Sequence, residues 1–128
     1  MVRYLVIAVG GALGSVVRYM LSGLVYRSSQ TLFPVGTLFV NLSGSFVIGL
    51  LWGISERYML SPLVRTFLFV GVLGGYTTFS TFALESYNLL NERELVMFGL
   101  NIALSVALGI VCIIAGLSVA RALIKCLA

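Results

Sequence analysis

Glycines and hydroxyl side chains interrupt a long apolar stretch at residues 74–82, where the sequence reads GGYTTFSTF. Thr78, Thr81 and Glu85 recur at the i, i+3, i+7 spacing that places side chains on one face of a helix. In hydrocarbon an unsatisfied backbone group is costly, so such an interruption persists only where protein buries it or where it lines a watery path. The sequence therefore predicts that this polar face belongs to the functional site.

Neutral hydrogen-bond donors around this stretch favour the binding of a small anion. Amide and hydroxyl hydrogens are donors, and the rim of an aromatic ring carries partial positive charge. Such groups allow the moderate, multi-site binding that rapid ion passage requires, whereas a fixed positive charge would hold the anion. The residues that we expect to face an anion are Asn41, Thr78, Phe79, Ser80 and Phe82. The alternative is that hydroxyls and amides join helices and that the phenylalanines pack in a core.

A break in the helix also frees carbonyl oxygens. We expect the carbonyl oxygens of residues 74–78 to lose their usual intrahelical partners. Freed carbonyls are ligands for a small hard cation, and Na⁺ suits a site built from neutral oxygens. The alternative is that nearby serine and threonine hydroxyls satisfy the broken backbone.

The inventory of catalytic side chains is thin. Histidine and aspartate are absent, which leaves most acid–base, triad and metal chemistries without a partner. The spacing of Cys112 and Cys126 supports neither a zinc motif nor an obvious disulfide. The only carboxylate side chains belong to Glu56, Glu85, Glu92 and Glu94. We therefore expect that the protein is not an enzyme.

The composition places these residues in a membrane. Of the 128 residues, 60% are hydrophobic and only 9% are charged, which is too few charges for the surface of a soluble domain. Four apolar segments, at residues 4–26, 35–54, 63–90 and 95–124, are each long enough to cross the hydrocarbon. The loops between them are too short for a domain outside the membrane. We predict an all-α chain that forms one domain, residues 1–128, with four transmembrane helices of which the third is broken.

Basic residues give a weak signal for orientation. Five lie on the side of the N-terminus and three on the other side, so the chain is close to balance and compatible with insertion in both orientations. The first group is Arg3, Arg57, Arg65, Arg121 and Lys125, and the second is Arg18, Arg27 and Arg93. The net charge of +4 indicates contacts with anionic lipid rather than with nucleic acid.

Three motifs together resemble one known family. They are GGALGSVVRY at residues 10–19, GTLFVNLSG at residues 36–44, and GGYTTFSTF followed by Ala83, Leu84 and Glu85. With the length and the four segments, they resemble the Fluc fluoride channels, the CrcB family, over the whole chain. The resemblance implies an antiparallel, dual-topology homodimer in the cell membrane, with two pores along the subunit interface and a structural Na⁺ at its centre. Fluoride would leave the cytoplasm passively, which lowers its toxicity.

The resemblance also assigns roles to residues. It implies that the backbone carbonyls of Gly74 and Thr77 bind Na⁺ and that Phe79 and Phe82 form an aromatic box beside the fluoride path. It makes Asn41 a donor that faces the pore. It implies a polar track toward a vestibule that is formed by Thr78, Ser80, Thr81, Glu85 and, on the fourth helix, Ser105.

Two positions carry open alternatives. Arg18 corresponds to a family arginine whose place near a vestibule would attract anions, but its side chain can equally extend to the membrane interface. Gly109 stands where the fourth helix is expected to carry another serine, and Asn101 is a candidate to compensate for it.

Two other classes of function compete with a fluoride channel. A small proton-coupled multidrug exporter is also a four-helix dimer, but that mechanism needs a buried carboxylate in the first helix, and this first helix has none. Glu85, late in the third helix, is the only candidate for that role. The other class is an assembly subunit without transport. Packing favours a dimer independently of the resemblance, because one four-helix chain has little room to bury a polar stripe, an asparagine and a helix break together. Small residues at Gly10, Gly14 and Gly44 would let helices approach closely.

Overall fold

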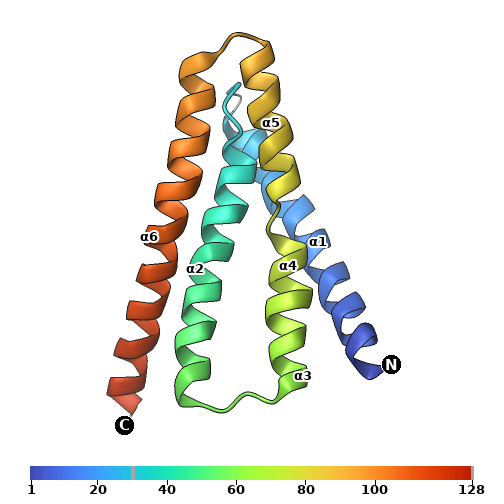
Figure 1. Ribbon diagram of the computed structural model, residues 1–128, viewed down its shortest axis with the longest axis vertical. Helices are drawn as coiled ribbons and strands as arrows, with labels where there is room; N and C mark the ends of the chain where they lie inside the picture. Colours follow the sequence, from blue (N-terminus) through green and yellow to red (C-terminus); the bar gives the residue numbers. More distant parts are fainter. Residues whose placement is uncertain (30, 128) are drawn as a thin grey trace.

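Four long helices make up the chain in the computed structural model, which describes residues 1–29 and 31–127 (Figure 1). The first is α1 (Val2–Ser29), the second is α2 (Val35–Arg57) and the last is α6 (Leu95–Leu127). Together with the composite third helix, Pro62–Asn91, each is long and apolar enough to cross a membrane. The predicted all-α fold with four spanning segments is confirmed. Residues 30 and 128 of the predicted single domain lie outside the described residues.

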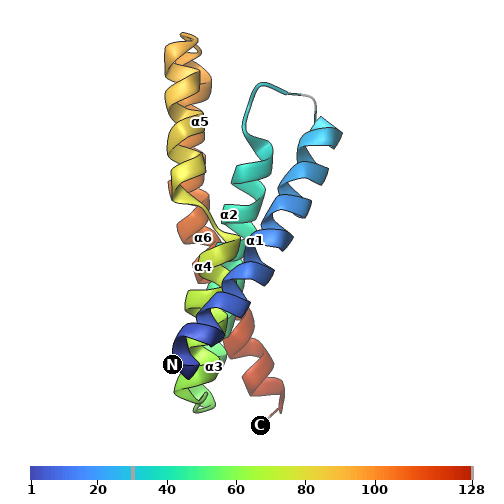
Figure 2. The ribbon, with the colours of Figure 1, turned by 90° about the vertical axis from the view of Figure 1, so that its right-hand side faces the viewer.

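The third helix consists of four pieces. A short α3 (Pro62–Arg65) leads into a π-helix, η1 (Thr66–Leu73), which α4 (Gly74–Tyr76) continues. Two residues in extended conformation then separate α4 from α5 (Phe79–Asn91). Figure 2 shows the direction change at this point: α4 lies against α1, whereas α5 runs beside α6. The predicted break is confirmed, and the π-helix before it was not expected.

The helical conformation persists through the two glycines. Gly74 is helical, and the amide of Thr77 still donates to the carbonyl of Leu73 at 3.0 Å. Gly75 permits close packing, because a Cβ atom there would lie 2.6 Å from the carbonyl oxygen of Gly11. The break thus begins after Tyr76.

Glycines on α1 bring it into direct contact with the backbone of the third helix. A Cβ atom on Gly10 would lie 2.9 Å from the carbonyl oxygen of Phe67, and one on Gly14 would overlap the carbonyl oxygen of Val72. The close approach expected at these glycines therefore occurs within one chain.

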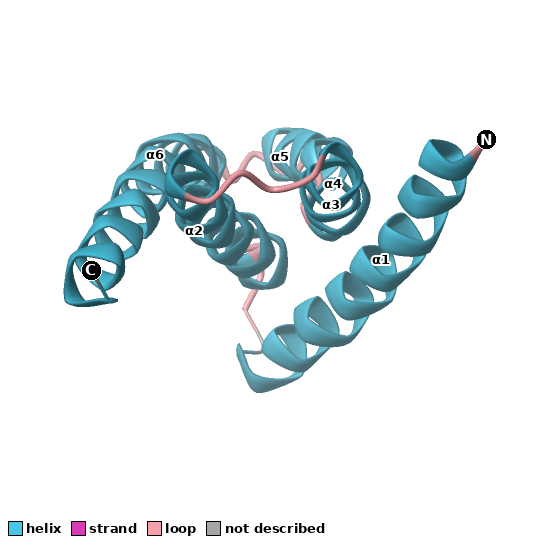
Figure 3. Cartoon of the chain, turned by 90° about the horizontal axis from the view of Figure 1, so that it is seen from below, coloured by secondary structure: helices cyan, strands magenta, loops and turns pink. Residues whose placement is uncertain are grey.

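The second close contact joins α2 to α6. A Cβ atom on Gly116 would lie 2.7 Å from the backbone nitrogen of Leu50, and one on Gly49 would overlap the carbonyl oxygen of Ile113. Seen along the bundle, α2 lies beside both α6 and the third helix, with α1 on the far side (Figure 3). Each outer helix is thus packed against a helix that is not its neighbour in sequence.

Few side chains are buried in this chain. Among the described residues, the buried hydrophobic side chains are those of Val40, Leu73, Tyr76, Leu89 and Ala120. The outer face of α6 exposes large apolar side chains such as Val106, Ile110 and Ile114. Lipid tails can cover these groups without cost, so the exposed apolar surface fits a membrane-embedded chain.

Candidate functional site

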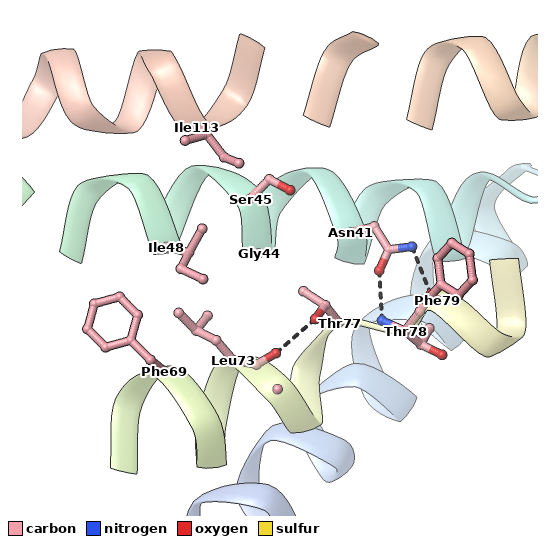
Figure 4. A pocket seen from close by; sticks show the side chains of 11 residues that line it. Asn41, Gly44, Ser45, Ile48, Phe69, Leu73, Thr77, Thr78, Phe79 and Ile113 are labelled. Carbon is pink, nitrogen blue, oxygen red and sulfur yellow. Dashed lines mark hydrogen bonds between the residues drawn. The ribbon is translucent and has the colours of Figure 1, made fainter. Parts of the chain in front are cut away.

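The break is paired with a side chain of α2. Thr78 adopts φ −148° and ψ 114°, which are values of an extended strand. Its backbone amide donates to Oδ1 of Asn41 at 2.8 Å, and Nδ2 of Asn41 donates to its carbonyl oxygen at 3.0 Å (Figure 4). Asn41 therefore satisfies both backbone groups of Thr78, a role that sequence reasoning did not assign to it.

Donors from α1 reach two further carbonyls at the break. Nη1 of Arg18 donates to the carbonyl oxygen of Thr77 at 3.2 Å, and the hydroxyl of Ser15 donates to that of Gly75 at 3.5 Å. Arg18 is thus half-buried and its side chain is directed to the break. Hydroxyl groups alone do not supply the hydrogen bonds to the backbone carbonyls at the break, because an arginine and an asparagine supply most of the donors. The i, i+3 spacing of Ser15 and Arg18 on α1 was the available signal for this pair.

The Gly74 carbonyl has lost its ordinary partner. In a continuous helix the amide of Thr78, four residues later, would donate to the carbonyl of Gly74. That amide donates to Asn41 instead. Gly74 is exposed in the single chain.

A groove of about 370 Å³ brings five of the predicted residues together. It lies between α2 and the third helix and is lined by both residues assigned to a cation, Gly74 and Thr77, and by Asn41, Thr78 and Phe79 from the predicted anion path. The structure therefore places the two predicted sites next to each other.

The two phenylalanines form one aromatic pair beside this groove. The ring centroids of Phe79 and Phe82 are 5.7 Å apart and the ring planes are inclined by 49°. Phe79 is 80% exposed, so its ring contributes almost nothing to packing within the chain. The packing alternative fails for Phe79 in the single chain, and its ring edge is free to contact whatever covers this face.

Three hydroxyls gather at the first turn of α5. The Thr78 hydroxyl lies 2.9 Å from that of Thr81 and 3.5 Å from that of Ser80, and it accepts the backbone amide of Thr81 at 3.3 Å. Thr78 is therefore the N-cap of α5, where the helix dipole also favours negative charge. Ser80 and Thr81 are exposed. The hydroxyl cluster predicted from the helical spacing is thus present and open on one side.

Glu85 points from α5 toward α1 and α2. Its Oε1 accepts hydrogen bonds from the hydroxyls of Tyr26, at 2.5 Å, and Thr37, at 2.8 Å. The other oxygen, Oε2, is buried without a partner. A pocket of about 180 Å³, which Asn88 and Glu92 also line, opens beside this carboxylate. Sequence reasoning found Glu85 but missed Tyr26 and Thr37, which lie near the facing ends of the first two helices.

The fourth-helix side of the site is built by α6. Asn101 is 1% exposed and its Nδ2 donates to the hydroxyl of Ser86 on α5 at 2.9 Å, so it joins two helices and does not replace the missing serine. A Cβ atom at Gly109 would lie 3.8 Å from the hydroxyl of Ser45 on α2, which therefore supplies a hydroxyl at this level. Ser105 is the second residue of the described chain with a buried, unpartnered side-chain oxygen. Both such residues, Glu85 and Ser105, belong to the predicted polar track.

We expect Ser105→Ala to separate conduction from stability. The Ser105 hydroxyl makes no hydrogen bond within the chain, so its removal should leave the midpoint of thermal unfolding unchanged or slightly higher. If the hydroxyl contacts a passing anion, ion flux should fall severalfold in liposomes. The matched control is Ser118→Ala, because the Ser118 hydroxyl donates to its own helix and is exposed. Unchanged flux in Ser105→Ala would remove this residue from the track.

The comparisons with known proteins agree with the motifs. Residues 5–117 match the family described as CrcB-like protein, Camphor Resistance (CrcB). This chain belongs to the CrcB family. Among its relatives, a protein of Geobacter sp. is 48% identical over 91% of this chain and 95% of the relative, and one of Maridesulfovibrio salexigens is 42% identical over 96% and 98%. Both are named "Fluoride-specific ion channel FluC", and a protein of Nitrobacter hamburgensis, 45% identical over 93% and 95%, is named "Fluoride-specific ion channel FluC 1". With its four apolar helices, this CrcB chain is a multi-pass membrane protein of the bacterial type.

Proposed function

We propose that this CrcB-family chain is a fluoride-selective channel that lets fluoride leave the cytoplasm passively and so lowers its toxicity. The observation that carries the proposal is the groove at the helix break, whose lining includes the amide of Asn41, the hydroxyl-bearing Thr78 and the aromatic Phe79. Their neutral character suits conduction, since no fixed charge holds the anion. The names of the relatives supply the identity of the ion. An ion channel, rather than an enzyme, is the class that these names support.

The working unit in this proposal is an antiparallel homodimer of dual topology. A single chain leaves Phe79, Ser80 and Thr81 exposed, and hydroxyls that face lipid tails find no hydrogen-bond partner there. A second copy laid over the same face would cover them and convert each groove into an enclosed path. Such a dimer has two pores along its interface, and the near-balance of basic residues between the two sides is compatible with it.

A structural Na⁺ at the centre of the dimer completes the proposal. The carbonyls of Gly74 and Thr77 from both subunits would give four oxygen ligands, and these two residues share one groove. The donor set fits, because the Gly74 carbonyl lacks its helical partner and the Thr77 carbonyl has a second lone pair beyond the one that Arg18 uses. Among the residues that the structure describes, no cluster of three histidine, cysteine or acidic side chains offers a competing site.

We expect fluoride flux to need Na⁺ without moving it. Purified protein that has been thoroughly freed of Na⁺, with K⁺ as the replacement, should fall to the flux of empty liposomes, because the crossing point of the two subunits loses its central charge. Radioactive Na⁺ should not cross with fluoride. Equal fluoride flux with and without Na⁺ would overturn the structural cation.

The first test of the function is fluoride efflux from liposomes that hold the purified protein, with a K⁺ gradient and valinomycin and a fluoride electrode as the readout. A matched experiment uses chloride. Fast fluoride efflux with silent chloride is the expected result. An exporter driven by protons would instead require a pH gradient, and α1 holds no carboxylate to carry the proton. No efflux from verified, folded protein in the presence of Na⁺ would contradict the proposal.

A further inference from the structure

We propose that Asn41 is a positioning residue that holds the helix break open and thereby keeps the Gly74 carbonyl free to bind a cation. This inference rests on the proposed structural Na⁺. It adds to the anion-facing role of Asn41 a second role that acts through the backbone of Thr78.

Asn41 and Thr78 form a pair that is joined by two hydrogen bonds. Both polar atoms of the Asn41 side chain bind the same residue, with 2.8 Å from the Thr78 amide to Oδ1 and 3.0 Å from Nδ2 to the Thr78 carbonyl. Two residues that exchange both hydrogen bonds are the repeating unit of an antiparallel sheet. The Asn41 amide thus acts as a one-residue strand partner, and the φ and ψ values of Thr78 are those of a strand.

A continuous helix would use the same amide hydrogen of Thr78. The helix continues as far as the bond from the Thr77 amide to the Leu73 carbonyl, and the next bond of the series would join the Thr78 amide to the Gly74 carbonyl. One amide hydrogen cannot serve both acceptors at full strength. Each molecule in which Asn41 holds Thr78 is therefore a molecule in which the Gly74 carbonyl is available to another ligand.

The backbone of α2 is tightly packed next to Asn41. Val40, next to Asn41, is fully buried. One turn later, Gly44 lets the third helix approach so closely that a Cβ atom there would overlap the Thr77 methyl group and would lie 3.2 Å from the Tyr76 ring. The part of α2 that carries Asn41 is thus packed against Tyr76, just before the break, and against Thr77 within it. Figure 4 shows Asn41 facing Thr77 and Thr78.

The two roles of Asn41 are separable by experiment. Its Nδ2 carries two hydrogens, of which one donates to Thr78 and one remains for the groove. Loss of an anion donor lowers flux at every Na⁺ concentration, whereas loss of the backbone pairing raises the Na⁺ concentration that the channel needs.

The test compares Asn41→Leu, which has a similar volume and no donor, with the parent protein and with Asn91→Leu, the same exchange at an exposed position of α5. Fluoride efflux is measured over a range of Na⁺ concentrations, and the ¹³Cα and ¹³Cβ chemical shifts of Thr77 and Thr78, which distinguish extended from helical backbone, are measured by NMR. In Asn41→Leu we expect the half-saturating Na⁺ concentration to rise about tenfold and the shifts of Thr77 and Thr78 to move from extended toward helical values. Asn91→Leu should change neither value.

Each other outcome contradicts a defined part of the proposal. Lower flux with an unchanged Na⁺ requirement would make Asn41 a pore donor alone, and unchanged chemical shifts of Thr77 and Thr78 would show that Asn41 does not hold the break open. If fluoride flux of the parent protein does not depend on Na⁺, the cation site of the proposed function is wrong, while the chemical shifts still decide whether Asn41 holds the break. If Asn41→Leu yields no folded protein, Asn41→Ser, which is too short to reach both groups of Thr78, takes its place in the same measurements.

Discussion

We expect Phe79→Ile and Phe82→Ile each to lower fluoride efflux by about tenfold or more while leaving the protein folded. Isoleucine keeps most of the apolar area but has no aromatic rim to attract an anion. The two rings form one pair beside the groove, and Phe79 is 80% exposed, so its removal takes little from the packing of the chain. Efflux from liposomes at saturating Na⁺ measures the effect.

The control for this prediction is Phe39→Ile. Phe39 is an exposed phenylalanine of α2 that does not line the groove, so the same exchange there should leave efflux unchanged. Unchanged efflux in both Phe79→Ile and Phe82→Ile would exclude the rings from the ion path. Loss of the assembled protein in either variant would mean that the rings serve packing between subunits.

The second large effect is on stability, at the contact between α1 and the third helix. Gly14→Ala should destabilise the protein by about 3 kcal/mol or prevent its folding, because the added methyl group overlaps the Val72 carbonyl and backbone cannot turn aside as a side chain can. Thermal unfolding in detergent, followed by circular dichroism, measures the change.

The same helix offers a matched control at Gly23. A Cβ atom there would have no atom of the chain within 4 Å, and alanine favours a helix more than glycine does, so Gly23→Ala should unfold at the same temperature or slightly higher. Equal stability of Gly14→Ala and the parent would show that the helices are farther apart than described. A large loss in Gly23→Ala would place a second subunit against that residue.

The sequence was sufficient for the architecture because the apolar segments are long and the interruption at residues 74–82 is local. It was not sufficient for the limits of the break. The missing side chain of Gly75 serves contact with Gly11, and sequence alone does not distinguish this use of glycine from conformational freedom of the backbone. Which residue leaves the helix depends on Asn41, more than thirty residues earlier in the chain.

Only part of the candidate site was predicted from the sequence. Helical spacing grouped Thr78, Thr81 and Glu85, because a spacing rule relates only residues of the same helix. The partners of Glu85 come from two other helices, Tyr26 on α1 and Thr37 on α2, and no spacing rule connects them. Distances between helices decide such contacts, and those depend on the glycine contacts that the structure shows.

The pairing of non-neighbouring helices has a consequence for synthesis of the protein. Gly10 contacts Gly71, which is 71 − 10 = 61 residues later, so at about 5–20 residues per second the ribosome needs roughly 3–12 s to supply the partner of α1. Gly49 of α2 likewise lacks its partner until Gly116 has been synthesised. During this time both early helices lie in lipid with their closest packing surfaces uncovered, and the nascent chain reaches its final tertiary structure only after the last helix has entered the bilayer.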